Sequence, residues 1–318
     1  MKGSRQTVIE PSHTDITATE LAGGEIGPFS PLGTPIPPGS RSGSGLAKIH
    51  MFVGGGSLLR GMIGAALFVG LWQVVTSFDQ WTGVSLPIVA QLPPPSSVLH
   101  AFLPLVRSHG FWQSAYLSFV RVLWGFIAAM VVGIPFGLLM AVNRTAKAVC
   151  FPVFEILRPI PPLAWVPAAI IFWPAPELSI TFVTFLGAFF TVVINTVGGA
   201  EQIDRRFLLA ARSMGADKAT IFRRVLLPAT LPSIATGAVV GMGITWQVVV
   251  AAEMISGGGQ GATTGGGGGL GFLIWNSYLG GAIPKVVVGM IVLGIMGYAS
   301  STIVRIASIK LMPWKTTA

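Results

Sequence analysis

Charged residues are scarce in this chain. Asp, Glu, Lys and Arg together make up 10% of its 318 residues, whereas 52% of the residues are hydrophobic. Soluble globular domains carry about 25% charged residues. The composition therefore excludes a soluble domain of this length and indicates a protein embedded in a membrane.

Cysteine and histidine are also rare. The chain has one cysteine, Cys150, and four scattered histidines. A single cysteine excludes an intrachain disulfide and leaves no second thiol for a metal cluster, so we interpret Cys150 as a small buried hydrophobic residue. We see no acid–base or metal-ligating group, and the sequence predicts no catalytic residue, no metal and no cofactor bound by the chain itself.

A phosphate-binding loop is missing as well. The glycine-rich run 257–271 contains Gly266-x-Gly268-x-x-Gly271, which formally matches a dinucleotide fingerprint. Five consecutive glycines produce such a match by chance, and no βαβ unit surrounds it. A P-loop also needs Lys followed by Ser or Thr after its last glycine. We interpret the run as a flexible loop and expect no ATPase activity in this chain.

Long apolar segments dominate the rest of the sequence. A membrane-spanning helix needs about 20 apolar residues, and five segments qualify: Leu58–Phe78, Val122–Val142, Leu178–Val197, Ile234–Ile255 and Val286–Ile306. A sixth, around residues 151–173, is interrupted by four prolines, which neighbouring helices can tolerate. The sequence therefore predicts an all-α integral membrane protein with about six transmembrane helices. Gly133-x-x-x-Gly137 and Gly237-x-x-x-Gly241 predict close helix packing, within the chain or across a dimer.

The two ends of the chain are expected in the cytoplasm. Residues 1–45 are rich in Gly, Pro, Ser and Thr without apolar periodicity and predict a disordered tail, followed by a membrane domain over residues 46–318. Of the 20 Lys and Arg residues, only Arg107, Arg121 and Lys285 fall on the outer side of this topology. That bias follows the positive-inside rule. Membrane lipid explains the basic excess, and nucleic acid is not needed as a partner.

The segment 204–228 is the most patterned part of the chain. We expect two short helices, capped by Asp204 and Asp217, with Gly215 ending the first. Pro228 and Pro232 should stop the second helix and redirect the chain into the next span. Apolar residues of the first helix share one face: Phe207, Leu208, Ala211 and Met214. This face predicts a helix pair that lies on lipid or touches a partner.

The spacing within this segment resembles the signature loop of ATP-binding cassette (ABC) importer permeases. Ala210-Ala211, three residues, Gly215, nine residues, Val225, one residue and Leu227-Pro228 match that loop, except that the family's leading Glu is Leu209 here. The resemblance covers residues 91–314. Leu92-Pro-Pro-Pro-Ser-Ser-Val-Leu and Arg158-Pro-Ile-Pro-Pro-Leu-Ala-Trp-Val-Pro are similar to the branch that imports nitrate, aliphatic sulfonates, taurine or bicarbonate. The resemblance implies a type I, MetI-like permease fold.

The resemblance also implies how the protein works. Two permease subunits, expected to form a homodimer in the bacterial plasma (inner) membrane, would form the translocation pathway. A cytoplasmic subunit would bind and hydrolyse ATP, and an extracytoplasmic solute-binding protein would deliver the solute. Residues 204–228 would be the coupling helices, and the residues expected to dock in the ATPase are Ala211, Gly215, Ala216, Asp217, Ile221 and Phe222. The solute would be a small anion, with a neutral organic nitrogen compound as the alternative.

Ionisable and polar groups within the spans are candidates for the pathway, since they are costly in a bilayer. Glu253 has three open roles: an ion pair with Arg121 or Lys285, a gating contact, or substrate binding. Arg121 would attract an anion or extend to the interface, and Asn195 would line the path or satisfy freed backbone. We expect Arg158 at the cytoplasmic edge. The alternative function is an ion-gradient-driven secondary transporter or channel, although the internal repeats and charge relays of such proteins are not visible.

Overall fold

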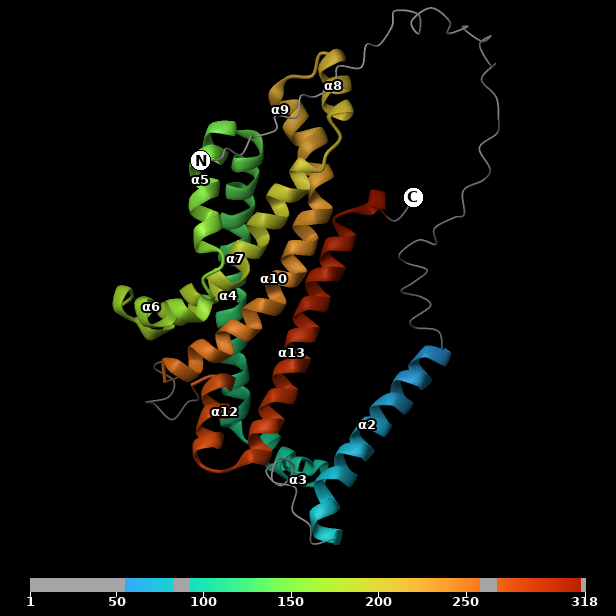
Figure 1. Ribbon diagram of the computed structural model, residues 1–318, viewed down its shortest axis with the longest axis vertical. Helices are drawn as coiled ribbons and strands as arrows, with labels where there is room; N and C mark the ends of the chain where they lie inside the picture. The colour runs from blue at the N-terminus through green and yellow to red at the C-terminus, as the bar shows by residue number, and fades with distance from the viewer. Residues whose placement is uncertain (1–54, 83–91, 258–267, 316–318) are drawn as a thin grey trace, which may run out of the picture. The chain divides into compact units, whose positions relative to one another are not determined.

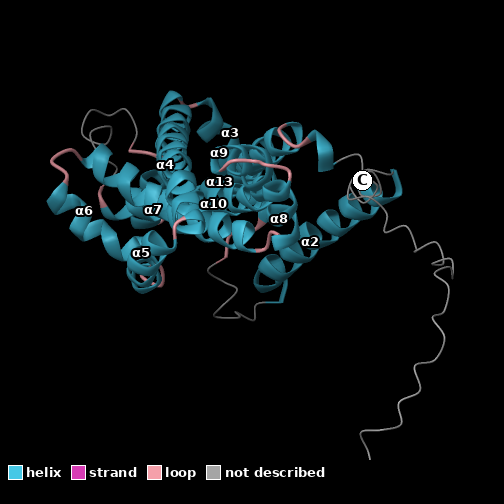
Figure 2. Cartoon of the chain, turned by 90° about the horizontal axis from the view of Figure 1, so that it is seen from above, coloured by secondary structure: helices cyan, strands magenta, loops and turns pink. Residues whose placement is uncertain are grey.

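The computed structural model describes residues 55–82, 92–257 and 268–315, and all regular structure within these ranges is helical (Figures 1 and 2). The predicted disordered tail, residues 1–45, lies outside the described residues. The long helices are α2 (Gly55–Thr82), α4 (His109–Val142), α7 (Pro176–Glu201), α10 (Leu227–Ile255) and α13 (Ile283–Lys310). The shorter ones are α3 (Pro95–Arg107), α5 (Arg144–Leu157), α6 (Val166–Phe172), α8 (Arg205–Ser213), α9 (Lys218–Ile221) and α12 (Leu270–Leu279).

Five helices in the described part of the chain are long and apolar enough to cross a membrane. They are Leu59–Phe78, His109–Val142, Pro176–Glu201, Lys218–Ile255 and Ile283–Lys310. The predicted interrupted span is a pair of helices, Arg144–Leu157 and Pro162–Phe172, bent by 90°. Pro159, Pro161 and Pro162 lie at the bend, where they lack the N–H groups that would continue the helix. The predicted six spans are thus five helices and one broken pair.

The core lies where α7 packs against α4 on one side and α10 on the other. Small residues bring these backbones close. A Cβ atom added to Gly137 of α4 would lie 2.8 Å from Cβ of Thr196, and one added to Gly237 of α10 would lie 2.8 Å from Cβ of Asn195. Both glycine motifs therefore pack within the chain, against α7.

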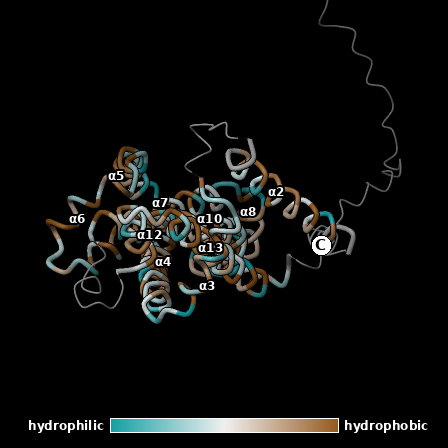
Figure 3. Tube along the Cα trace, turned by 90° about the horizontal axis from the view of Figure 1, so that it is seen from below, coloured by the Kyte–Doolittle hydropathy of each residue, from teal (hydrophilic) through white to brown (hydrophobic). Residues whose placement is uncertain are grey.

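Helix α2 stands apart from this core, and most of its side chains between residues 59 and 78 are exposed, although Thr76 and Ser77 are buried. Large apolar residues such as Leu67 and Phe68 are exposed between Leu59 and Phe78, and Figure 3 shows hydrophobic residues along much of this helix. Exposed apolar side chains on a helix of spanning length are suited to lipid contact. α2 contacts α3 of the same chain.

The prediction that Pro228 and Pro232 stop the helix after the loop is wrong. A π-helical turn, Phe222–Leu226, joins α9 directly to α10, and the chain runs as one helical span from Lys218 to Ile255. A proline has no N–H and crowds the carbonyl one turn earlier. The wider π turn absorbs this at Pro228, where the N–H of Leu227 donates to the carbonyl of Phe222.

Candidate functional site

The loop between α7 and α10 is built around Gly215. Asp204 caps α8, where its Oδ1 accepts a hydrogen bond from the N–H of Arg206 at 2.9 Å. At the other end Gly215 has a φ of 79°, a left-handed conformation that favours glycine. The N–H of Ala216 then reaches back to the carbonyl of Ala211 at 3.0 Å, which closes the helix end. The predicted cap and hinge are confirmed.

Asp217 caps α9 in the same way. Its Oδ1 accepts a hydrogen bond from the N–H of Thr220 at 3.2 Å. Hydrogen bonds from the side chain and backbone of Thr220 hold the pKa of the Asp217 carboxyl below its usual value. The loop therefore has a fixed conformation of its own, with two capped helices and one glycine hinge.

The residues predicted to dock in an ATPase differ in exposure. Gly215 and Asp217 are exposed, Ala216, Ile221 and Phe222 are half-buried, and Ala211 is buried. The exposed apolar side chains of the loop are instead Phe207, Leu209 and Met214, at 66%, 58% and 80% exposure. Sequence reasoning placed Phe207 and Met214 on the apolar face but did not include them in the docking set. Their exposure is the signal that singles them out.

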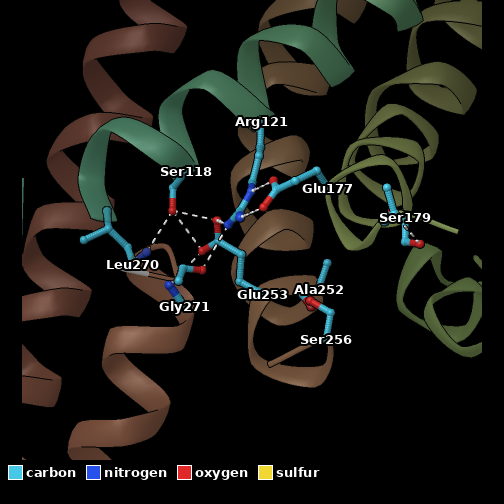
Figure 4. A network of polar contacts seen from close by, with 11 residues as sticks. Ser118, Arg121, Glu177, Ser179, Ala252, Glu253, Ser256, Leu270 and Gly271 are labelled. Carbon is cyan, nitrogen blue, oxygen red and sulfur yellow. Dashed lines mark hydrogen bonds and ion pairs between the residues drawn. The ribbon is translucent and has the colours of Figure 1, made fainter. Parts of the chain in front are cut away.

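A second group of polar residues forms a buried charge cluster: Ser118 and Arg121 of α4, Glu177 of α7, Glu253 of α10 and the backbone of residues 268–271 (Figure 4). Arg121 lies between the two carboxylates. Its Nε and Nη2 donate to Glu177 at 2.8 and 2.7 Å, and its Nη1 donates to Oε1 of Glu253 at 2.8 Å. Arg121 is 3% exposed and Glu253 is fully buried. Such buried charges are stable only when they are paired and hydrogen-bonded.

Every oxygen of Glu253 is occupied. The hydroxyl of Ser118 lies 2.7 and 2.8 Å from the two carboxylate oxygens, and the N–H of Gly271 donates to Oε2 at 2.9 Å. The N–H of Leu270 in turn donates to the Ser118 hydroxyl at 2.8 Å. The cluster thus connects α4, α7, α10 and the start of α12.

The end of the glycine run fits around this carboxylate. Gly269 has a φ of 98°, and a Cβ atom there would lie 2.3 Å from Cδ of Glu253. A Cβ atom on Gly271 would lie 2.2 Å from the carbonyl oxygen of Val250. The prediction of a flexible loop is therefore wrong for residues 268–271, where the close packing of Gly269 and Gly271 leaves no room for a side chain. Residues 258–267 lie outside the described part of the chain.

The three predicted pathway residues fall into two places. Glu253 pairs with Arg121, one of the open alternatives, and the burial of Arg121 excludes its extension to the interface. Asn195 lies on α7, where its Nδ2 donates to the carbonyl of Thr191 at 2.8 Å. Sequence reasoning missed Ser118 and Glu177; the acid directly after Pro176 at the start of a span was the one available signal.

We expected Arg158 at the cytoplasmic edge of the helices. It lies instead beside the middle of α7. Lys147 of α5 pairs with Glu201 at the end of α7, and farther along α5 the ring of Phe154 lies 5.4 Å from that of Phe190. The two helices are therefore antiparallel. Arg158, which follows α5, lines a cavity together with Gly187.

No metal site or disulfide emerges from the described residues. Within them, no group of three or more His, Cys, Asp and Glu side chains could hold a metal ion. Cys150 is a free thiol and half-buried, somewhat more exposed than predicted.

Comparison with known proteins decides the family. The profile of the family described as "binding-protein-dependent transport system inner membrane component" matches residues 133–311, more than half of the chain. The chain belongs to this family. As a member it is a multi-pass permease subunit of an ABC importer, and ATP hydrolysis belongs to a separate subunit. This excludes the alternative of a secondary transporter or channel.

Relatives of this permease support the predicted branch. It is 32% identical to the nitrate import permease protein NrtB of Synechocystis, over 77% of this chain and 86% of that one. It is 32% identical to the taurine transport system permease protein TauC of Escherichia coli, over 74% and 84%. It is also 32% identical to the bicarbonate transport system permease protein CmpB of Synechococcus elongatus, over 81% and 90%.

A solved structure supports the fold. The permease resembles a chain in the crystal structure of a bacterial ABC transporter involved in the import of the acidic polysaccharide alginate. The TM-score is 0.52 at 15% sequence identity, over 83% of this chain and 98% of that one. The predicted type I, MetI-like permease fold is confirmed.

Proposed function

We propose that this permease imports a small anionic solute and is driven by a cytoplasmic ATPase that binds the loop 204–228. The capped helix pair around Gly215 carries the proposal, because it has the spacing of the importer loop and a fixed conformation with exposed apolar side chains. Both termini and the loop are cytoplasmic in this proposal, in keeping with the distribution of Lys and Arg. Two copies of the chain would form the pathway, and a solute-binding protein would deliver the solute from outside.

The docking surface combines two sets of residues. Phe207, Leu209 and Met214 project from α8, and we propose that they contact the ATPase together with the exposed Gly215 and Asp217. The buried Ala211 and the half-buried Ala216, Ile221 and Phe222 hold the helix pair in shape. Buried apolar contacts supply most of the affinity of such a surface.

The helical span Lys218–Ile255 offers a route for the force. It begins in the proposed docking loop and ends at Ile255, two residues after Glu253 of the charge cluster. A rigid helix transmits a displacement at one end to the contacts at the other. ATP-driven movement of α9 would therefore shift α10 relative to α4 and α7.

The solute class follows from the relatives. Nitrate, taurine and bicarbonate, the solutes in the names of the three relatives above, are small and carry an oxyanion group. The similar distance of this chain from all three, at 32% identity each, selects none of them. A small oxyanion or sulfonate is therefore the proposed class.

A pair of substitutions in the loop tests the docking proposal. One places a charge on the proposed contact surface, and the other places it where the family's pattern has Glu. Met214→Glu places a charge on the proposed contact surface, and we expect the detergent-solubilised variant to lose co-purification with the ATPase. Leu209→Glu introduces the same charge where the family's own pattern has Glu, and we expect it to retain the ATPase. If both variants capture the ATPase as the wild type does, the proposed docking surface is wrong.

A further inference from the structure

Arg158 lies at a break in a membrane helix, beside the middle of a spanning helix. The helix pair α5 and α6 bends by 90° just after it, at Pro159–Pro162. Irregular backbone at this depth is found where it is covered by protein or lines a polar cavity. An ionisable side chain in such a place is rare in membrane proteins and points to a functional role.

A cavity of about 310 Å³ opens beside this side chain. It is lined by Arg158 and Pro162 at the break, by Gly187, Phe190 and Thr191 among other residues of α7, and by Ile244 of α10. Ligand pockets in proteins start at about 300 Å³, so the space suits a small solute. The broken span, α7 and α10 all contribute to its lining, so the proposed shift of α10 relative to α7 would change its shape.

Two hydrogen-bond donors at this cavity have spare capacity. Arg158 donates from Nη1 to Glu155 at 3.1 Å, and its other guanidinium N–H groups make no hydrogen bond within the described residues. A guanidinium carries five N–H donors and binds oxyanions in a bidentate manner. Half of the side chain is exposed.

Thr191 differs from the other threonines of the core. Thr184, Thr196 and Thr245 each donate the hydroxyl to the carbonyl four residues earlier, at 2.6 to 2.8 Å. The hydroxyl of Thr191 makes no such bond within the described part of the chain, although its backbone carbonyl accepts from Asn195. Its proton is available to a bound oxygen atom.

We propose that this cavity is an anion subsite of the translocation pathway. The guanidinium of Arg158 and the hydroxyl of Thr191 would bind the oxyanion group, and Phe190 and Ile244 would contact any apolar part of the solute. The carboxylate of Glu155 competes with the anion for Arg158. This inference rests on the proposed import of a small anion, and it replaces Arg121 and Glu253, which are paired within the buried charge cluster, as the pathway charges.

Direct binding tests the subsite without the ATPase. The purified chain in lipid nanodiscs is titrated calorimetrically with nitrate and with methanesulfonate. We expect Arg158→Gln to weaken binding about tenfold to a hundredfold and Thr191→Val about fivefold, as for the loss of a charged and a neutral hydrogen bond. Glu155→Gln should strengthen binding several-fold, because it removes the competitor. Arg144→Gln, at the start of α5 and outside the cavity, should leave binding unchanged.

The outcomes separate the subsite from the proposed function. Arg158→Lys serves as the conservative variant and should fold as the wild type does and retain part of the affinity. If neither anion binds the wild type, or if Arg158→Gln and Thr191→Val bind like the wild type, the subsite is wrong, whether or not the ATPase is captured. If anion binding follows the expected order but no ATPase co-purifies, the subsite stands and the coupling proposal falls.

Discussion

At the scale of single residues, the burial of Glu253 has the largest energetic consequence. Its carboxylate, the guanidinium of Arg121 and the carboxylate of Glu177 place one positive and two negative charges in one cluster. Glu177 is 40% exposed and keeps part of its hydration, whereas Glu253 is fully buried. Removing a partner from a buried pair leaves a charge without compensation.

We therefore expect Arg121→Ala, which leaves the fully buried carboxylate of Glu253 without its ion-pair partner, to lower the free energy of unfolding by roughly 3–5 kcal/mol, as for other buried pairs. Glu177→Ala should cost clearly less, because solvent screens an exposed partner. Thermal unfolding of the two purified variants in the same detergent compares them. Equal losses of stability would contradict the assigned roles.

The backbone around this carboxylate makes a second prediction. Gly269→Ala would force a side chain into a left-handed conformation, at a cost of about 1–2 kcal/mol, and against the carboxyl group of Glu253. Gly243→Ala is the matched control, since no atom lies within 4 Å of a Cβ added there. We expect a large drop in melting temperature for the first variant and little change for the second. A stable Gly269→Ala protein would show that the chain does not pack around Glu253 in this way.

At the scale of helices and loops, the sequence predicted what is local and missed what depends on distant partners. Hydropathy located the spans, and the caps Asp204 and Asp217 and the hinge Gly215 followed from residue type and spacing. The buried cluster around Glu253 could not be predicted, because Ser118, which completes it, is 135 residues away from Glu253 in the chain. The depth of Arg158 was missed because the length of α5 before the proline break was not visible in the hydropathy.

The same locality explains the proline error. Proline normally ends a helix, and nothing in the sequence distinguishes a stop from a π turn that lets the helix continue. The π turn matters for function, because it makes α9 and α10 one continuous element between the loop and the charge cluster.

The cap of α9 gives a prediction at this scale. Asp217→Ala removes the acceptor for Thr220 and should weaken ATPase capture at neutral pH, whereas Asp217→Asn should retain it, since Asn caps equally well. The pKa of Asp217 is lowered in the folded loop, so the stabilisation from its charge is present above the unfolded pKa and is lost as the pH falls through the folded one. Asp217 therefore stays charged near neutral pH, and the protection of the α9 amides against exchange should not change with pH in this range. Equal loss with Asn and Ala would show that the charge, and not the cap, matters.

At the scale of the whole molecule, three parts of the chain are connected. The loop 204–228 is the proposed ATPase contact, the span Lys218–Ile255 transmits its movement, and the cavity beside Arg158 is the proposed anion subsite. The charge cluster of Arg121 and Glu253 joins the far end of α10 to α4 and α12. The family assignment fixes the class of transporter, and these three parts describe how this chain would perform the transport.

The central claim is that the loop touches the ATPase, and cross-linking tests it most directly. Because Cys150 is the only cysteine in the sequence, a Cys150→Ser background allows one thiol to be placed at will. Met214→Cys in that background, labelled with a benzophenone maleimide in native membranes, should cross-link to a P-loop ATPase on illumination. Tyr278→Cys, exposed on α12 at the other end of the core helices (Figure 1), should not. Cross-linking of the ATPase from residue 278 and none from residue 214 would contradict the account.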